Sequence, residues 1–254
     1  MRMNSNSIES TDLRKKLVRQ RPFLLFKFDA DQNPFSTNEP GIEIGDEPPL
    51  GDEPPILFMS IGNGEFVHHY RKEVTSNILE IGNSIILGIE SQSKIGSYEE
   101  WVYIKNSIKE NNDLTLESGP AFIIPNEMES ENGIVEININ NRDTLKNNFK
   151  YTWENLEHLL PCSAKIVNGR AVSICRSVRK YKNILECGVD TVKAFRGMGY
   201  ASSVVAHWAN RVWGNYQIPC YSTQWDNTAS MAVAKKMKLR QYAIDISINL
   251  RESK

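Results

Sequence analysis

Residues 191–201 read TVKAFRGMGYA, and the periodicity of the sequence changes within this stretch. The residues before it, NILECGVDTV (183–192), form a strand-like run, whereas those after it, YASSVVAHWANRVWG (200–214), place apolar side chains at helical spacing. The sequence therefore predicts a strand that passes through two closely spaced glycines into a helix.

Such a junction exposes the first N–H groups of the helix, which have no partner within it. These groups and the helix dipole favour the binding of phosphate oxygens. Glycine at positions 197 and 199 allows an anion to approach the main chain, and Arg196 adds positive charge. The third glycine of a dinucleotide-binding fingerprint and the Gly-Lys-Ser/Thr of a P-loop are both absent. A simple tight turn is the alternative interpretation.

Composition indicates an ordinary globular protein. The 254 residues include 40% hydrophobic and 24% charged residues, and the net charge is -1. This balance gives no electrostatic footprint for nucleic acid or for an anionic membrane. No apolar run approaches the roughly 20 residues that span a bilayer, and the polar start lacks a signal-peptide core. Four widely spaced cysteines suggest reduced thiols, so we expect a cytoplasmic protein.

The C-terminal half has a regular order of elements. Asn168-Gly169 between two alternating apolar runs predicts a β-hairpin, and Asp226 or Asn227 is a candidate helix cap. The expected strands are 133–140, the two arms of the hairpin, 183–192, 218–225 and 240–250, and the expected helices are 142–160, 200–214 and 226–239. This order predicts an α+β fold around a mostly antiparallel sheet.

The N-terminal half is less regular. Strands are expected at 22–28 and 55–61, and a helix at 97–112. The Pro-, Asp- and Glu-rich segment 45–56 is expected to be a surface loop. The adjacent histidines of HHYR (68–71) point in different directions and do not suggest a shared metal ion, so no metal is expected.

A polar, turn-prone stretch near 125–133 divides the chain into residues 1–132 and 133–254. We expect the first segment to be an additional α/β region that helps to shape the substrate site, although a dimerisation element or a divergent copy of the second segment is equally compatible with the sequence.

Residues 134–250 resemble the GNAT superfamily of acyl-CoA-dependent N-acyltransferases. The run Arg196-Gly197-Met198-Gly199-Tyr200-Ala201 fits the family's Gln/Arg-x-x-Gly-x-Gly/Ala pattern, and WDNTASMAVAKKMKL (225–239) is similar to its second cofactor segment. The resemblance implies a GNAT-like mixed sheet flanked by helices, with acetyl-CoA as the acyl-donor co-substrate.

The resemblance also implies a splay between parallel strands 184–192 and 218–225, with the pantetheine arm in the gap. Main-chain groups of the first strand would pair with that arm, in the manner of an added strand. The residues expected to bind acetyl-CoA are Val189, Thr191, Val192, Arg196, Gly197, Met198, Gly199, Tyr200, Ala201, Ser202, Asn227 and Ser230.

Acyl transfer to an amine requires removal of a proton and stabilisation of the oxyanion and the leaving thiolate. Glu186 is the leading candidate base, because it lies in an apolar run, and if it faces the cleft, burial would raise its pKa. The alternative is an outward-facing carboxylate paired with Arg176 or Arg179. Asp190, on the same face of the strand, is a weaker candidate.

In similar enzymes a tyrosine of the second cofactor helix protonates the thiolate, but Ala234 occupies that position here. Tyr242 and Tyr221 are possible substitutes, as is solvent. A covalent route through Cys187 or Cys220 is disfavoured, because no activating histidine lies near either in the sequence.

The sequence therefore predicts an N-acetyltransferase that acts on the primary amine of a small molecule, by direct attack in a ternary complex. The alternatives are an acyl-CoA-binding sensor or scaffold with reduced catalysis and a protein N-acetyltransferase. No nucleic-acid or membrane partner is expected, and a homodimer is compatible with the sequence.

Overall fold

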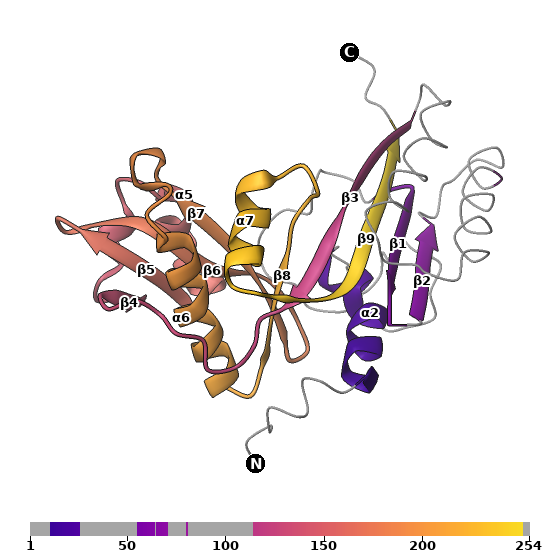
Figure 1. Cartoon of the computed structure of the whole chain (residues 1–254). Coiled ribbons are helices and arrows are strands. Elements are labelled where there is room, and N and C mark those ends of the chain that lie inside the picture. Colours follow the sequence, from indigo (N-terminus) through magenta and orange to yellow (C-terminus); the bar gives the residue numbers. More distant parts are fainter. Residues whose placement is uncertain (1–10, 26–54, 64, 71–79, 81–113, 251–254) are drawn as a thin grey trace.

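The computed structural model describes residues 11–25, 55–63, 65–70, 80 and 114–250. Nine strands within these residues form one sheet in the order β2-β1-β9-β3-β8-β7-β6-β5-β4 (Figure 1). All neighbouring strands are antiparallel except β7 and β8, which are parallel. The strands are β1 (Leu57–Gly62), β2 (Glu65–Tyr70), β3 (Leu114–Ile123), β4 (Ile134–Ile137), β5 (Cys162–Val167), β6 (Arg170–Tyr181), β7 (Ile184–Thr191), β8 (Ile218–Ser222) and β9 (Arg240–Leu250).

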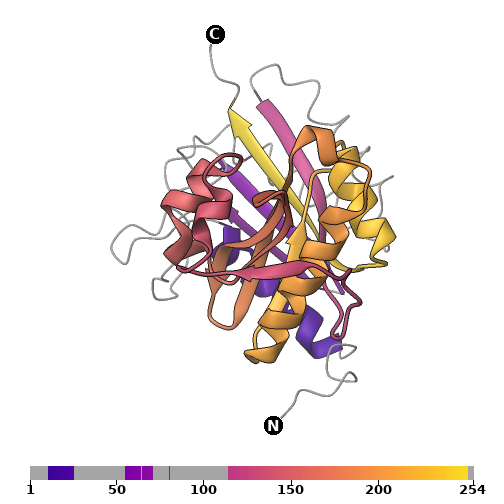
Figure 2. The same ribbon diagram turned by 90° about the vertical axis from the view of Figure 1, so that its left-hand side faces the viewer.

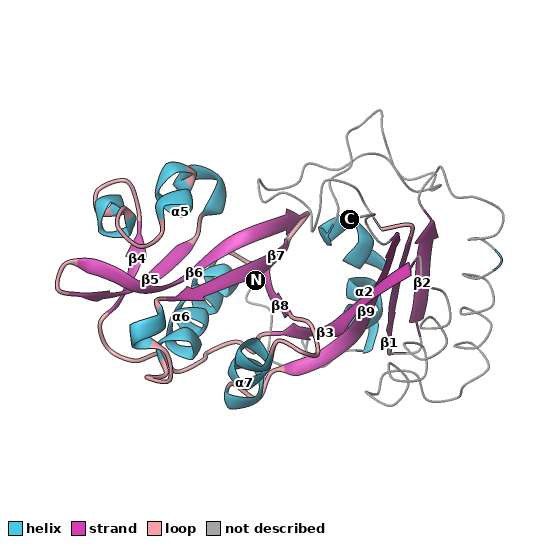
Figure 3. Ribbon diagram, turned by 90° about the horizontal axis from the view of Figure 1, so that it is seen from above, coloured by secondary structure: helices cyan, strands magenta, loops and turns pink. Residues whose placement is uncertain are grey.

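Helices cover both faces of this sheet. Figure 3 shows α6 and α7 on one face, and α2 and α5 on the other. Figure 2 shows α6, in orange, beside α7, in yellow. The mixed, mostly antiparallel sheet with flanking helices confirms the predicted fold class. The helices are α2 (Thr11–Leu25), α5 (Lys150–Glu154), α6 (Tyr200–Gly214) and α7 (Thr228–Lys236), and the 3-10 turns are η1 (Arg142–Leu145), η2 (Leu156–Leu159) and η3 (Lys193–Phe195).

Helix α6 occupies the predicted residues because its apolar side chains form one face. Val204, Val205, Trp208 and Val212 are fully buried in a core shared with strands β6, β7 and β8. The indole N–H of Trp208 donates to Ser177 Oγ on β6 at 3.1 Å, so the ring's polar edge is also satisfied. This packing fixes the start of α6 relative to the sheet.

The predicted hairpin is confirmed between β5 and β6. Asn168 and Gly169 have φ angles of 49° and 74°, so both lie in the left-handed region. A two-residue turn of type I′ needs positive φ at both positions, which explains the Asn-Gly pair. Val167 and Arg170 are the first cross-strand partners beside the turn.

Two predicted elements are wrong. Residues 22–25 belong to α2 and not to a strand, while 26–28 lie outside the described residues. Leu17, Val18 and Arg21 of α2 are buried, at helical spacing, against the sheet. Burial of this face outweighs the local strand preference of the apolar run that follows it.

The single helix expected at 142–160 is instead split into η1, α5 and η2. Asn148 Nδ2 donates to the main-chain oxygen of Ala171 at 2.8 Å, across to β6. Asn155 Nδ2 donates to the main-chain oxygen of Tyr151 at 2.9 Å. The Asn155 bond is local and competes with the helical ladder, whereas the Asn148 bond attaches the segment to β6, and the segment breaks near both residues.

Strands from both predicted segments share the sheet. β9 pairs with β1 on one side and with β3 on the other, so β1, β2 and β3 extend the sheet formed by residues after 133. The strand expected at 55–61 is confirmed as β1, and the final strand as β9. The division at residue 132 stays a prediction. The helix expected at 97–112 and residues 45–54 of the expected loop lie outside the described residues.

Candidate cofactor site

Strands β7 and β8 part from each other after a short parallel contact. They pair only through Ile184–Ile218, Leu185–Pro219 and Glu186–Cys220, although β7 continues for five more residues to Thr191. β7 stays paired with β6, and the end of β8 pairs with β3, so each strand follows its own neighbour. The expected splay is therefore present, and among the described residues no strand pairs with the β8-facing side of β7 beyond Glu186.

The main chain turns between β7 and α6 as the two glycines require. Gly197 and Gly199 have φ angles of 78° and 83°, a region that residues with a Cβ rarely adopt. Gly199 is the N-cap of α6, and its carbonyl oxygen accepts from Ser202 Oγ at 2.8 Å and from the N–H of Ser203 at 3.3 Å. The N–H groups at the start of α6 precede this first helical bond and are available to an anion.

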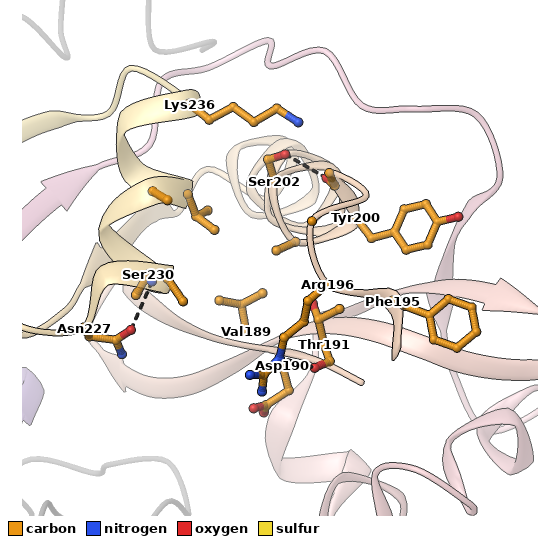
Figure 4. A pocket seen from close by; sticks show the side chains of 16 residues that line it. Val189, Asp190, Thr191, Phe195, Arg196, Tyr200, Ser202, Asn227, Ser230 and Lys236 are labelled. Carbon is orange, nitrogen blue, oxygen red and sulfur yellow. Dashed lines mark hydrogen bonds between the residues drawn. The ribbon is translucent and has the colours of Figure 1, made fainter. Parts of the chain in front are cut away.

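A pocket of about 580 Å³ lies between β7, the start of α6 and helix α7 (Figure 4). Most residues predicted to bind acetyl-CoA come together there: Val189, Thr191, Arg196, Gly197, Gly199, Tyr200, Ala201, Ser202, Asn227 and Ser230 line the pocket. Val192 and Met198 do not line it, and the side chain of Met198 is exposed. The binding roles of these residues stay predictions, but their common location is a finding.

Helix α7 forms the second wall. Asn227 is its N-cap, and the side-chain oxygen of Asn227 accepts from the N–H of Ser230 at 3.0 Å. Sequence reasoning placed Asn227 and Ser230 here and named Asp190 only as a weaker candidate base, but it did not assign the pocket-lining residues Phe195, Ala229, Ala232, Val233 and Lys236. The sequence pattern could have identified three of these residues, because Ala229, Val233 and Lys236 follow helical spacing along one face of α7.

Glu186 is buried away from this pocket. Its Oε1 accepts from Arg179 Nη1 at 2.8 Å and from Ser222 Oγ at 2.9 Å, and its Oε2 pairs with Arg21 Nη1. Burial alone would raise the pKa of Glu186, but the charges of Arg21 and Arg179 and the hydrogen bonds lower it below its usual value. The rise in pKa that we expect for a Glu186 that faces the cleft therefore does not occur, because the side chain is buried elsewhere.

The geometry favours the alternative interpretation of Glu186, a carboxylate paired with arginine. It corrects one detail, because Glu186 is buried, with 1% of its surface exposed, and does not face outward. Asp190 differs from Glu186. It lines the pocket, its side chain is 56% exposed, and its Oδ2 lies 2.6 Å from Arg176 Nη1.

The two candidate tyrosines have different surroundings. The hydroxyl of Tyr221, on β8, is hydrogen-bonded to Ser230 Oγ, which belongs to a pocket-lining residue. Burial raises the pKa of Tyr221, so its phenol stays protonated at neutral pH. Tyr242 is buried in the core beside Arg21, whose Cζ lies 6.0 Å from the ring centroid. Of the two, Tyr221 is the one that reaches the pocket wall.

The four cysteines are buried and free. Burial raises the pKa of Cys220 to about 12, which leaves almost no thiolate at neutral pH. Within the described ranges, no group of three or more His, Cys, Asp or Glu residues is placed to hold a metal ion. Nor does any helix of the described chain combine the length and apolarity needed to cross a membrane.

The splayed strands, the glycine turn and the pocket are the features that the resemblance to acyl-CoA-dependent acyltransferases implies. The sequence model of the GNAT acetyltransferase family matches residues 127–242. Residues 127–242 are therefore a GNAT acetyltransferase domain, and the predicted resemblance is confirmed. No curated protein matches the sequence.

Solved structures with similar folds include acetyltransferases. One is a GCN5-related N-acetyltransferase-like protein from Streptococcus suis 89/1591, which is 14% identical in sequence. The match covers 95% of this chain and 100% of that protein, with a TM-score of 0.46. A GNAT-family acetyltransferase from Colwellia psychrerythraea is 11% identical, with coverages of 95% and 96% and a TM-score of 0.46. A third structure is AAC(6')-Iy in complex with a bisubstrate analogue, CoA-S-monomethyl-acetylneamine. It is 17% identical in sequence, and the match covers 42% of this chain and 89% of that protein, with a TM-score of 0.33.

Proposed function

We propose that this protein transfers an acetyl group from acetyl-CoA to the primary amine of a small molecule, by direct attack in a ternary complex. The observation that carries the proposal is the pocket between the open side of β7, the glycine turn and α7. It offers main-chain groups along β7 to an extended chain and free N–H groups at the start of α6 to a diphosphate. Acetyl-CoA contains both parts.

The residues of α7 fit the pantetheine arm. Ala229, Val233 and Ala232 give this wall a small, apolar surface, and Asn227 and Ser230 add polar groups at its beginning. On the opposite side, Val189 and Thr191 lie on the part of β7 that no longer pairs with β8. An extended amide chain laid along β7 would replace the missing strand.

Proton transfer to the leaving thiolate is assigned to Tyr221. Its protonated hydroxyl lies against Ser230 Oγ, so a proton can pass from the phenol through the serine hydroxyl to a thiolate in the pocket. The phenolate then regains a proton from water, and the attacking amine loses its proton to water, so that a neutral amine and acetyl-CoA give the amide and the free thiol. Arg21 and Arg179 hold Glu186 ionised. In this proposal the charge of Glu186 has a structural role, which is to stabilise strands β7 and β8 at the point where they part.

The test is an assay of thiol release. Purified protein is mixed with acetyl-CoA and a panel of small amines, and free CoA is followed over time. Turnover that depends on an added amine supports the proposal, and Tyr221→Phe should lower kcat more than KM. Tight binding of acetyl-CoA without turnover across a broad panel would contradict it.

A second candidate function is acyl-CoA binding without efficient catalysis, as in a sensor or scaffold. Two observations favour it. Ala234 occupies the position at which similar enzymes carry a tyrosine, and Glu186 is held in ion pairs away from the pocket. Binding without turnover in the assay above would support this function. Turnover with a peptide α-amine or a lysine, but not with small amines, would instead support a protein N-acetyltransferase.

A further inference from the structure

Lys236, the last residue of α7, places its ammonium group over the glycine turn. A Cβ added to Gly199 would lie 2.8 Å from Lys236 Nζ and 3.4 Å from Glu131 Oε1, so one positive and one negative group flank the N-cap of α6. Figure 4 shows the lysine extending from α7 toward the first turn of α6, above the pocket that it helps to line.

The other nearby cations are already engaged. Arg196 Nε donates to the main-chain oxygen of Thr191 at 3.2 Å, on the β7 side of the pocket. Lys165 Nζ donates to the main-chain oxygen of Asn132 at 3.0 Å and lies 5.3 Å from the centre of the Tyr200 ring. Among the residues that the structure describes, Lys236 Nζ makes no hydrogen bond or ion pair. Its charge is therefore available to a ligand at the turn.

We propose that Lys236 is the side chain that binds the diphosphate of the acyl donor, opposite the main-chain N–H groups of the glycine turn. This assignment rests on the proposed function and replaces Arg196 as the principal charged contact. A charge-assisted bond from an ammonium to a phosphate oxygen is stronger than a neutral one, and it adds to the main-chain donors. Glu131 opposes it, because its carboxylate repels a diphosphate bound at the same turn.

Removing the charge of Lys236 and removing the charge of Glu131 should have opposite effects on CoA affinity, which calorimetric titration with CoA can measure. Lys236→Met keeps the length of the side chain without the charge, and we expect it to weaken CoA binding by about tenfold. Lys236→Arg should retain most of the affinity. Glu131→Gln should tighten binding, because a repulsive charge is removed. Lys235→Met is the matched control, since Lys235 is exposed on the same helix but does not line the pocket, and it should leave the affinity unchanged.

Dephospho-CoA identifies the group that is bound, because it keeps the diphosphate but lacks the 3′-phosphate. The loss caused by Lys236→Met should be the same for CoA and dephospho-CoA, and it should shrink as salt concentration rises. A loss confined to CoA would assign Lys236 to the 3′-phosphate and overturn the proposal. Unchanged CoA affinity in Lys236→Met would also overturn it. Failure of the unsubstituted protein to bind CoA would instead overturn the proposed function.

Discussion

Arg21 and Glu186 form a buried ion pair between the N-terminal helix α2 and strand β7, 165 positions apart in the sequence. Both side chains are 1% exposed. Arg21 also pairs with Asp245 on β9, and Arg179 pairs with Glu186, so two positive and two negative charges balance in this cluster. Glu186 is the last residue of β7 that pairs with β8, and the cluster therefore lies where the two strands part.

The first prediction concerns the stability that this cluster provides. Glu186→Gln removes one carboxylate and leaves Arg21 and Arg179 buried with less counter-charge. We expect the free energy of unfolding to fall by about 3–5 kcal/mol, measured by urea denaturation. Glu154→Gln is the control, because Glu154 makes a surface pair with Lys150 and should change stability by less than about 1 kcal/mol. Similar effects for the two variants would contradict the structural role of Glu186.

The second prediction concerns how the stability that Glu186 provides depends on pH. The folded-state pKa of Glu186 lies below its value in the unfolded chain, which is about 4.3. Between these two pKa values the unfolded state therefore binds more protons than the folded state. The stability that ionised Glu186 contributes is complete above the unfolded-state pKa and is lost as pH falls through the folded-state pKa. Urea denaturation between about pH 7 and pH 3 should show a shallower loss of stability in Glu186→Gln than in the unsubstituted protein. Parallel curves would exclude Glu186 as a source of the acid sensitivity.

The third prediction separates the two glycines of the turn. Both have positive φ, so Gly197→Ala and Gly199→Ala should each lower stability by about 1–2 kcal/mol. A methyl group at 197 meets open space, whereas one at 199 meets the ammonium of Lys236. CoA affinity, measured by calorimetry, should therefore fall further in Gly199→Ala. A larger loss in Gly197→Ala would show that the anion binds nearer to position 197.

The fourth prediction compares the two tyrosines. Tyr221→Phe removes the hydrogen bond to Ser230 and should cost about 1 kcal/mol of stability. We also expect it to lower kcat in any amine-dependent reaction. The hydroxyl of Tyr242 is buried and makes no hydrogen bond of acceptable geometry with the described residues, so Tyr242→Phe should leave stability and kcat nearly unchanged. The reverse pattern would move the acid role to Tyr242.

The fifth prediction concerns the thiols. Burial raises the pKa of both Cys162 and Cys220 to about 12, so neither should react with iodoacetamide in the folded protein at neutral pH. Both should react after unfolding in urea. Mass spectrometry after labelling locates the modified residues. Acetylation of Cys220 by acetyl-CoA in the folded protein would reopen the covalent route that its burial disfavours.

The sequence by itself determined the elements that depend on neighbouring residues. The Asn168-Gly169 hairpin, helix α6, a cap of α7 at Asp226 or Asn227 and strand β9 were predicted because periodicity and turn chemistry are local properties. The glycine turn was predicted for the same reason. Two predicted elements were wrong. A distant contact decided the first, because α2 buries one face on the sheet, while the helix at 142–160 is broken near Asn148, which bonds to β6, and near Asn155, which bonds locally to Tyr151.

Only the tertiary structure decided how the charged side chains are used. No local pattern connects Arg21 with Glu186, yet their contact lowers a pKa that burial alone would raise. Helical spacing puts Lys236, and not Lys235, on the pocket face of α7, but only the packing of α7 against α6 brings its ammonium group close to Gly199. Coulomb interactions depend on distance in space and on exclusion of water, and folding sets both for residues that lie far apart along the chain.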